Sequence, residues 1–155
     1  MTKSGLVLCL FLILMVQGCK KDTDYIIYHK FPDQFWYRYN ILQFEIPIEG
    51  SPLPYDISFF ANHTKDYSFD NLDFNMIMTT PSGEERINEY HFVIKRKDGG
   101  FTGTCYKDSC QAIIALKKGI LLRQKGTLKI AIENLVPRLE IKGLLGVGIR
   151  MHLCK

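Results

Sequence analysis

The sequence predicts an all-β protein built as a single antiparallel β-sandwich (jelly-roll-like) domain. Three observations support this fold class. After the first 24 residues, apolar and polar residues alternate with a period of two much more often than with the helical period of 3.6. Clusters of glycine and proline interrupt the alternating runs at intervals of about 8–12 residues, as in sandwiches and barrels. The sequence contains no internal repeat and no low-complexity segment.

The N-terminus reads as a lipoprotein signal peptide. Leu6–Cys19 is a short apolar run that follows one positive charge, Lys3, and contains no acidic residue. A membrane-spanning helix needs about 20 apolar residues, so this run fits an export signal better than a permanent span. Gly18 stands directly before Cys19, so that cleavage there would leave Cys19 as the lipidated first residue. A plain signal peptide with an incidental cysteine and an uncleaved anchor helix remain alternatives.

This interpretation divides the chain into three parts. We expect the signal peptide over residues 1–18, a lipidated tether over residues 19–24 and the β-sandwich domain over residues 25–155. A domain of this length has the commonest size, about 100–150 residues. The chain is 46% hydrophobic and 23% charged, which is ordinary for a globular protein and excludes wholesale disorder.

The strands are predicted in chain order from alternation. In the first, the even-numbered residues from Leu42 to Ile48 are all apolar and share one face. Pro47 weakens the hydrogen-bond ladder, as expected at a strand end or a sheet edge. The last predicted strand carries Val147, Ile149 and Met151 inward. The predicted strands cover residues 41–48, 55–59, 72–78, 90–94, 127–133 and 145–153.

Turn signals separate these strands. Pro81–Gly83 closes the third strand as a hairpin turn would, and Asp98–Gly100 closes the fourth. Gln111–Leu122 allows either a strand pair or a short helix. Arg138–Leu144 is expected to be a connecting loop.

The cysteines suggest a disulfide in an exported domain. Cys105 and Cys110 bracket four residues, and Cys154 is the residue before the C-terminus. An exported protein lies in a compartment that permits disulfides, so a Cys105–Cys110 bridge is one expectation. Pairing of Cys154 with either partner is the other, and one thiol is left over.

Motifs of catalysis are absent from the sequence. It contains no GxSxG, no HExxH, no glycine-rich phosphate loop, and no CxxC or HxxxH spacing for zinc. We therefore expect a non-enzyme without metal or cofactor. The four histidines are dispersed and are expected on strand surfaces: His29, His63, His91 and His152. Net charge is +4 and scattered, with no basic face, so we expect no nucleic-acid partner.

The aromatic residues are concentrated before residue 75, where Phe35–Tyr39 reads FWYRY. In an extended segment, consecutive side chains point to opposite faces, so these side chains cannot all be in the core. Trp36, Tyr37 and Arg38 are therefore the candidate interaction surface, because Trp, Tyr and Arg dominate binding energy in protein interfaces. There are three alternatives for this surface: it binds a protein partner, it stacks on a sugar ring, or it is a solvent-exposed edge of the core with no binding role.

Several short motifs follow one another along the chain. They are Phe31-Pro32-x-x-x-Trp36, Phe44-Glu45-Ile46-Pro47, Tyr67-Ser68-Phe69-Asp70-Asn71-Leu72, Pro81-Ser82-Gly83, Gly100-Phe101-Thr102-Gly103, Gly126-Thr127-Leu128, and Leu139-x-x-x-Gly143-x-x-x-Val147-Gly148-Ile149-Arg150. Their order resembles that in the GldH family of gliding-motility lipoproteins, and the resemblance covers essentially the whole mature chain.

The resemblance implies an outer-membrane-associated lipoprotein of the gliding motility and type IX secretion machinery. Such a protein would be held by its lipid in the cell envelope, at the periplasmic or the cell-surface face, and would act through protein contacts. A surface lipoprotein with a carbohydrate-binding sandwich is the alternative. The sequence departs from the family pattern at Leu145-Gly146, at Val136-Pro137 and in the Cys105 and Cys110 pair.

Overall fold

The computed structural model describes residues 24–154, and the predicted signal peptide and Cys19 lie outside these residues. Within them the chain forms strands and no helix, and none of their segments is a helix that could span a membrane. The strands are β1 (Tyr25–Lys30), β2 (Phe35–Tyr37), β3 (Leu42–Ile48), β4 (Tyr55–Thr64), β5 (Asn71–Thr79), β6 (Glu85–Val93), β7 (Thr104–Tyr106), β8 (Ser109–Ile120), β9 (Gly126–Asn134), β10 (Glu140–Lys142) and β11 (Leu144–Leu153).

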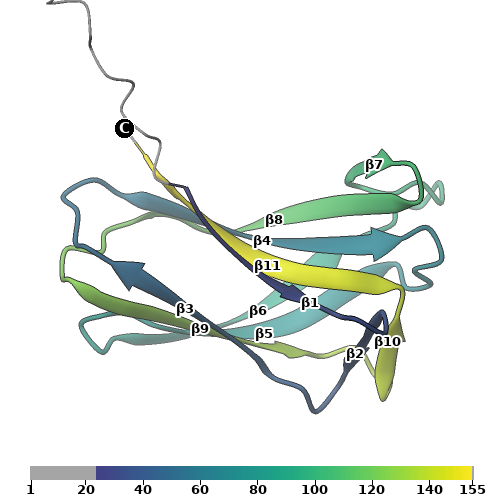
Figure 1. The fold of residues 1–155 in the computed structure, drawn as a ribbon, viewed down its shortest axis with the longest axis horizontal. Helices are drawn as coiled ribbons and strands as arrows, with labels where there is room; N and C mark the ends of the chain where they lie inside the picture. Colours follow the sequence, from purple (N-terminus) through teal and green to yellow (C-terminus); the bar gives the residue numbers. More distant parts are fainter. Residues whose placement is uncertain (1–23, 155) are drawn as a thin grey trace, which may run out of the picture.

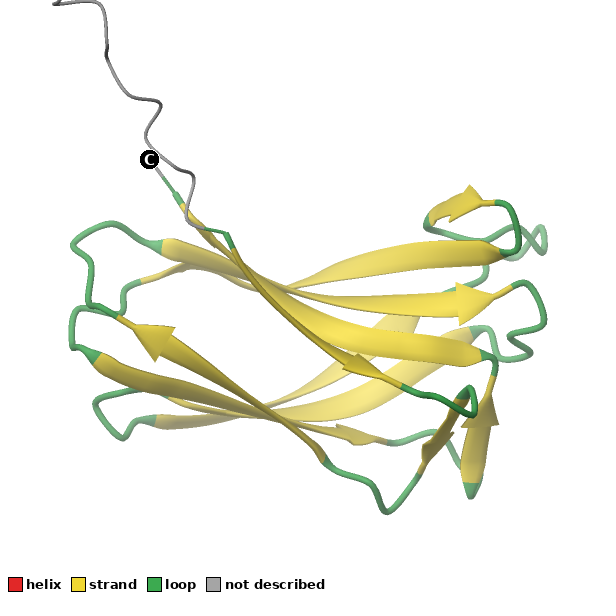
Figure 2. Ribbon diagram, viewed as in Figure 1, coloured by secondary structure: helices red, strands yellow, loops and turns green. Residues whose placement is uncertain are grey.

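Two antiparallel sheets pack face to face, as Figures 1 and 2 show. One has the order β1-β11-β4-β8-β7 and the other the order β3-β9-β5-β6. We leave out the three short strands β2, β7 and β10 and number the eight long strands from one to eight along the chain. The two sheets then have the orders 1-8-3-6 and 2-7-4-5. These interleaved orders are those of a jelly roll, which confirms the predicted fold class.

The core lies between the sheets and follows from strand alternation. In β3 the residues Leu42, Phe44, Ile46 and Ile48 are buried, and the residues between them are exposed. In β5 the buried residues alternate with half-buried ones, and in β11 Val147, Ile149 and Met151 are buried, as predicted. Pro81–Gly83 forms the turn between β5 and β6, also as predicted.

Two sequence expectations about local structure were wrong. Gln111–Leu122 is mostly one long strand, β8, which pairs with β4 through register shifts near Ile57 instead of folding into a strand pair or a helix. Arg138–Leu144 is not only a loop, because it contains β10, which pairs with β2. Both expectations failed because strand pairing depends on segments that are distant in the sequence: β8 pairs with β4, and β10 pairs with β2. The strands β1, β2 and β7 were not predicted.

The two ends of the sandwich differ in what they carry. Asp24 and Cys154, the first and last described residues, lie at one end, together with the loops 49–54, 80–84 and 121–125 (Figure 1, left). We call this the tether end, because the predicted tether precedes Asp24. The opposite end, here the far end, carries β2, β10 and β7 (Figure 1, right).

Candidate interaction site

A two-stranded sheet of β2 and β10 closes the far end of the sandwich. Its register pairs Tyr37 with Glu140, Trp36 with Ile141 and Phe35 with Lys142. Paired residues in an antiparallel ladder project to the same side, so each pair shares one face of this small sheet. Trp36 and Ile141, the middle pair, are both fully buried, so the face that they share is the one that points into the core.

The structure corrects the expectation that Trp36 belongs to an interaction surface. Its side chain is 0% exposed, and its ring stacks on Phe31 with a centroid distance of 5.7 Å. Its indole Nε1–H donates to the backbone oxygen of Asn40 at 2.8 Å. A buried indole needs such an acceptor, so Trp36 is a core residue with a satisfied polar group.

The neighbours of Trp36 form a row of stacked rings on the outer side. Phe35 and Tyr37 stack at 6.2 Å between ring centroids, and Tyr37 and Tyr39 at 5.8 Å. Tyr39 is 81% exposed, and so is Leu139, which comes directly before β10. We define the aromatic face as Phe35, Tyr37, Tyr39 and Leu139. It presents apolar surface that is already ordered by its own stacking.

Local hydrogen bonds hold the aromatic face in place. The Tyr37 hydroxyl donates to Asp33 at 3.2 Å, and a second oxygen of the same carboxylate accepts from the Phe35 backbone N–H at 3.2 Å. The hydrogen bond to Asp33 is the main reason that the pKa of Tyr37 lies above its usual value, so its hydroxyl stays protonated. The Arg38 N–H donates to the Leu139 oxygen at 2.9 Å and joins the two segments.

A shallow hollow adjoins the aromatic face. It is lined by Ser68, Phe69, Pro137, Arg138, Leu139, Glu140 and Lys142. The hollow therefore combines apolar walls with charges of both signs. This composition is usual for the rim of a protein interface, where apolar anchors are surrounded by polar groups.

Of the three predicted surface residues, the structure leaves two on the surface. Tyr37 is half-buried in the stacked row and Arg38 is exposed, whereas Trp36 is in the core. Strand alternation places Trp36 on one face and Phe35 and Tyr37 on the other, but it does not show which of the two faces is buried. Phe35, Tyr39 and Leu139 were therefore missed.

The structure joins Cys105 and Cys110 as a disulfide, and Cys154 is a free thiol at the tether end. The bridge links β7 to β8 across a register pair and holds a hairpin whose tip carries Tyr106, 74% exposed. Burial and the Asp56 carboxylate raise the pKa of the Cys154 thiol, which favours the protonated form.

His63 was expected on a strand surface, and the structure shows that it is buried. Its ring lies between Tyr67 and Phe101, at centroid distances of 5.4 and 4.8 Å. Its Nδ1 is 2.9 Å from the Thr64 oxygen, and its Nε2 has no partner among the described residues. Because a carbonyl only accepts, Nδ1 carries a proton. Burial is the main reason that the pKa of His63 is lowered.

Residues 24–154 contain no cluster of three or more His, Cys, Asp or Glu side chains that could hold a metal ion. Two of the other three histidines each pair with a single carboxylate. His91 Nδ1 is 2.7 Å from Asp73, and His152 Nδ1 is 2.6 Å from Asp24.

Two sequence comparisons match nearly the whole chain. A family model described as GldH lipoprotein matches residues 24–151. The gliding motility lipoprotein GldH of Flavobacterium johnsoniae is 24% identical over 156 residues, which cover 96% of this chain and 95% of that protein. The matched segment of the family model includes all eight long strands of the sandwich apart from the last residues of β11.

Two solved structures are distantly similar. TmCBM61, solved in complex with β-1,4-galactotriose, is 14% identical with a TM-score of 0.32, over 84% of this chain and 81% of that one. A chain of infectious bursal disease virus, Gx strain, is 12% identical with a TM-score of 0.37, over 86% of this chain and 32% of that one.

Proposed function

This chain belongs to the GldH lipoprotein family, and from that premise we propose that it acts without catalysis, through protein contacts, in the gliding motility and type IX secretion machinery of the outer membrane. The family match supports a gliding motility lipoprotein. The proposal adds the location, the mode of action and the surface that makes the contact. One observation carries it: an exposed, prestacked aromatic face stands at the end of the domain opposite the tether.

The anchor in this proposal is lipid on Cys19. Each buried CH₂ of an acyl chain contributes about 0.8 kcal/mol, and a single chain binds a membrane only marginally. Stable retention therefore needs two or three chains on this cysteine. Labelled palmitate should enter the wild-type chain and be absent from Cys19→Ala. A mass spectrum that retains residues 1–18 would contradict this part of the proposal.

The aromatic face suits a protein partner for three reasons. Tyr39 and Leu139 are exposed enough to be covered by another surface. The stacking of Tyr37 on Phe35 and Tyr39 lowers the entropy that would be lost on binding, since these rings are already ordered. Arg38 stands beside them, and aromatic residues with arginine are the usual hot spots of interfaces. The distance from the tether leaves this end free for a partner beyond the membrane surface.

The test compares two exposed tyrosines in tagged full-length protein. Tyr39→Ala should leave the thermal stability unchanged and reduce recovery of partners that cross-link to wild type in living cells. Tyr106→Ala is the matched control, because Tyr106 is similarly exposed but lies on the β7 hairpin. A Cys19→Ala chain controls for anchoring. The same partners at the same yield with Tyr39→Ala would show that the aromatic face is not the contact.

Sugar binding is the second candidate function, and the stacked row is the observation that favours it. Tyr39, at the end of the row and 81% exposed, offers an aromatic ring on which a sugar ring can stack. A glycan array probed with the full-length protein in detergent separates the two functions. Binding that Tyr39→Ala abolishes would favour the sugar, whereas a protein adaptor should bind no glycan.

A further inference from the structure

A hollow of about 350 Å³ lies on the outer face of the five-stranded sheet, toward the far end. This sheet consists of β1, β11, β4, β8 and β7, which can be followed in Figure 1. Each of the five strands contributes to the lining, which includes Tyr28, Leu145, Asn62, Gln111 and Thr104. We call this site the outer hollow. Its volume is within the range of about 300–1,000 Å³ that is usual for small-ligand sites.

The register of the sheet brings the polar side chains of the outer hollow together. Gly146 pairs with Asn62, and Asn62 pairs with Gln111. Gln111 pairs in turn with Thr104, so these positions form one row across four strands. Ala61, the neighbour of Asn62 in β4, is fully buried, so the row itself faces outward. The two amides touch, because Gln111 Nε2 donates to Asn62 Oδ1 at 2.9 Å.

Tyr28 forms the wall on the β1 side. It pairs with Gly148, and its phenol extends over Gly146, where it occupies the space that a Cβ would need. The glycine thus allows the phenol to reach from β1 toward the amide pair. The Tyr28 ring is parallel to that of Phe60 within 2°, with 5.9 Å between the centroids. Phe60 is buried and supports a ring that is itself 42% exposed.

The opposite wall belongs to the hairpin of β7 and β8. Thr104 and Ser109, which both line the outer hollow, are each next to a cysteine of the Cys105–Cys110 disulfide. This bridge joins the two strands across a register pair. Gly103, just before β7, packs so closely on β8 that a Cβ would collide with the Gln111 backbone. Both walls of the outer hollow are therefore held in place by packing or by a covalent bond.

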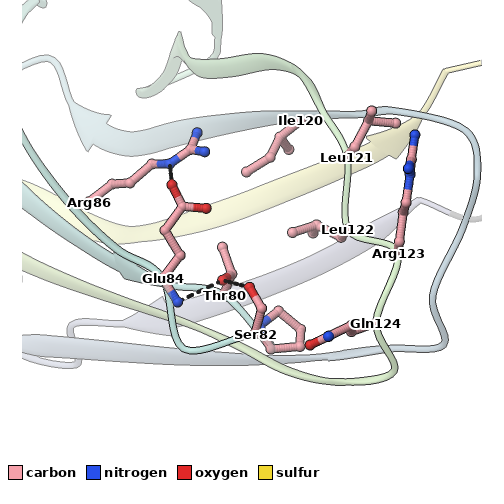
Figure 3. A pocket seen from close by; sticks show the side chains of 10 residues that line it. Thr80, Ser82, Glu84, Arg86, Ile120, Leu121, Leu122, Arg123 and Gln124 are labelled. Atoms are coloured by element: carbon pink, nitrogen blue, oxygen red, sulfur yellow. Dashed lines mark hydrogen bonds and ion pairs between the residues drawn. The ribbon is translucent and has the colours of Figure 1, made fainter.

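The lining of the outer hollow contains no charged side chain. It differs in this from the hollow at the tether end, whose lining includes Glu84, Arg86 and Arg123 (Figure 3). The hollow beside the aromatic face also carries charges of both signs. An ionised ligand would lose hydration in the outer hollow without gaining a countercharge, and this cost favours a neutral ligand.

The amide pair keeps hydrogen-bonding capacity on both of its members. Their mutual bond uses one N–H of Gln111 and the oxygen of Asn62, and neither side chain bonds to another residue of 24–154. The Asn62 amide nitrogen remains as a donor and the Gln111 oxygen as an acceptor. A sugar hydroxyl both donates and accepts, so neighbouring hydroxyls of one sugar ring match this pair. The exposed Tyr28 ring adds an apolar surface for the C–H groups of a sugar.

We propose that the outer hollow binds a neutral carbohydrate. Asn62 and Gln111 form hydrogen bonds with its hydroxyl groups, and the Tyr28 ring stacks on one of its sugar rings. The amide pair and the packed phenol are ordered before binding, which reduces the entropy lost when the sugar binds. This inference goes beyond the proposed protein contact, since an adaptor that used the aromatic face alone would bind no glycan. Sugar binding would be a second activity of the same domain, on a separate surface.

A glycan array probed with full-length protein in detergent tests the inference. The array carries neutral oligosaccharides of glucose, galactose, mannose and N-acetylglucosamine, together with sialylated and uronic acid glycans. Neutral glycans should be bound and acidic ones should not. Gln111→Ala should weaken the binding about tenfold, the scale of one or two lost neutral hydrogen bonds. Gln43→Ala changes an exposed glutamine on β3 in the other sheet, so this matched control should bind as wild type does.

Variants of Tyr28 separate the loss of binding from a loss of folding. Tyr28→Leu removes the aromatic ring and should weaken the binding of neutral glycans. Tyr28→Phe keeps a ring on Phe60 and over Gly146, so it should melt as wild type does and retain the stacking. Thermal melts of every variant accompany the array. Full binding by a folded Tyr28→Leu chain would contradict the stacking role.

The contrary outcomes are distinct. No glycan binding by wild type, or equal binding by wild type and Gln111→Ala, would overturn the site. A preference for acidic glycans would overturn the neutral ligand. Tyr39→Ala should leave binding at the outer hollow unchanged, and binding lost in Tyr39→Ala but kept in Gln111→Ala would assign the sugar to the aromatic face. Unchanged partner recovery with Tyr39→Ala contradicts the proposed protein contact alone and leaves the outer hollow untouched.

Discussion

The indole N–H of Trp36 donates to the backbone oxygen of Asn40 across 2.8 Å, and this bond ties the start of the aromatic face to the core beneath it. Tyr39, the residue before this acceptor, is 81% exposed. One short segment thus contains a core anchor and a ring open to solvent. The same bond fixes the backbone on which the stacked row depends, so the stability of the far end and its binding surface are coupled.

Replacing Trp36 should destabilise the fold. Trp36→Ala removes a fully buried ring and leaves a cavity, a change that costs about 3–5 kcal/mol in other proteins. Chemical denaturation of the full-length protein should show that loss in its free energy of unfolding. Tyr39→Ala is the matched control and should change it by less than about 0.5 kcal/mol. Equal effects of the two variants would contradict the assignment of the inward and outward faces.

Adding a methyl group at Gly148 should disrupt the packing of β11 against its neighbours. A Cβ there would lie 2.4 Å from the Ile27 oxygen and 2.5 Å from the Phe60 ring. Overpacking of this kind typically costs about 1–3 kcal/mol, so Gly148→Ala should lower the melting temperature by several degrees.

Gly99→Ala provides the comparison for Gly148. Gly99 has a φ of +81° and no atom near its Cβ position, so that only backbone strain opposes the substitution. We expect it to cost about 1–2 kcal/mol. The two effects can be told apart by shortening the Phe60 side chain. Phe60→Leu should relieve only the part of the Gly148→Ala cost that comes from the Phe60 ring, because the Ile27 backbone oxygen stays in place, and it should have no effect on Gly99→Ala.

The stability of the protein should fall as the pH drops below about 6.5, the ordinary pKa of histidine. Burial lowers the pKa of His63 in the folded state, so the unfolded chain takes up a proton before the folded one does. Stability due to neutral His63 is therefore complete above pH 6.5 and is lost progressively below it, down to the folded pKa. Thermal melts between pH 7 and 5 measure this slope.

His63→Phe should flatten that slope. The substitution keeps an aromatic ring between Tyr67 and Phe101 and removes the titrating nitrogen. The Thr64 oxygen retains the Tyr67 N–H as a donor at 3.2 Å. An undiminished slope in this variant would assign the pH dependence to other groups.

Opening the Cys105–Cys110 bridge should destabilise the protein by about 2 kcal/mol, because the closed loop is short and constrains few conformations of the unfolded chain. The double variant Cys105→Ser, Cys110→Ser should lower the melting temperature and expose the β7 hairpin to proteolysis. Reductant should have the same effect on wild type. Cys154→Ser, which removes the free thiol, should be neutral, and a matching loss there would contradict the role of the bridge.

The sequence by itself determined the fold class, because each long strand carries its own alternation and its own turn signals. Leu42–Ile48 shows this directly, since every apolar residue predicted on one face is buried. The family resemblance, carried by short motifs in a constant order, was confirmed in the same way. Such features are local, so they can be recognised in the sequence without knowing which distant segments pair with one another.

The tertiary structure alone decided which face of Phe35–Tyr37 is buried and which residues meet at the ends of the sandwich. Alternation separates two faces, but only the pairing of Trp36 with Ile141, 105 positions later in the chain, sends Trp36 inward and leaves Tyr37 outside. Contacts between residues so far apart depend on how the sheets pack, and no local pattern encodes that packing.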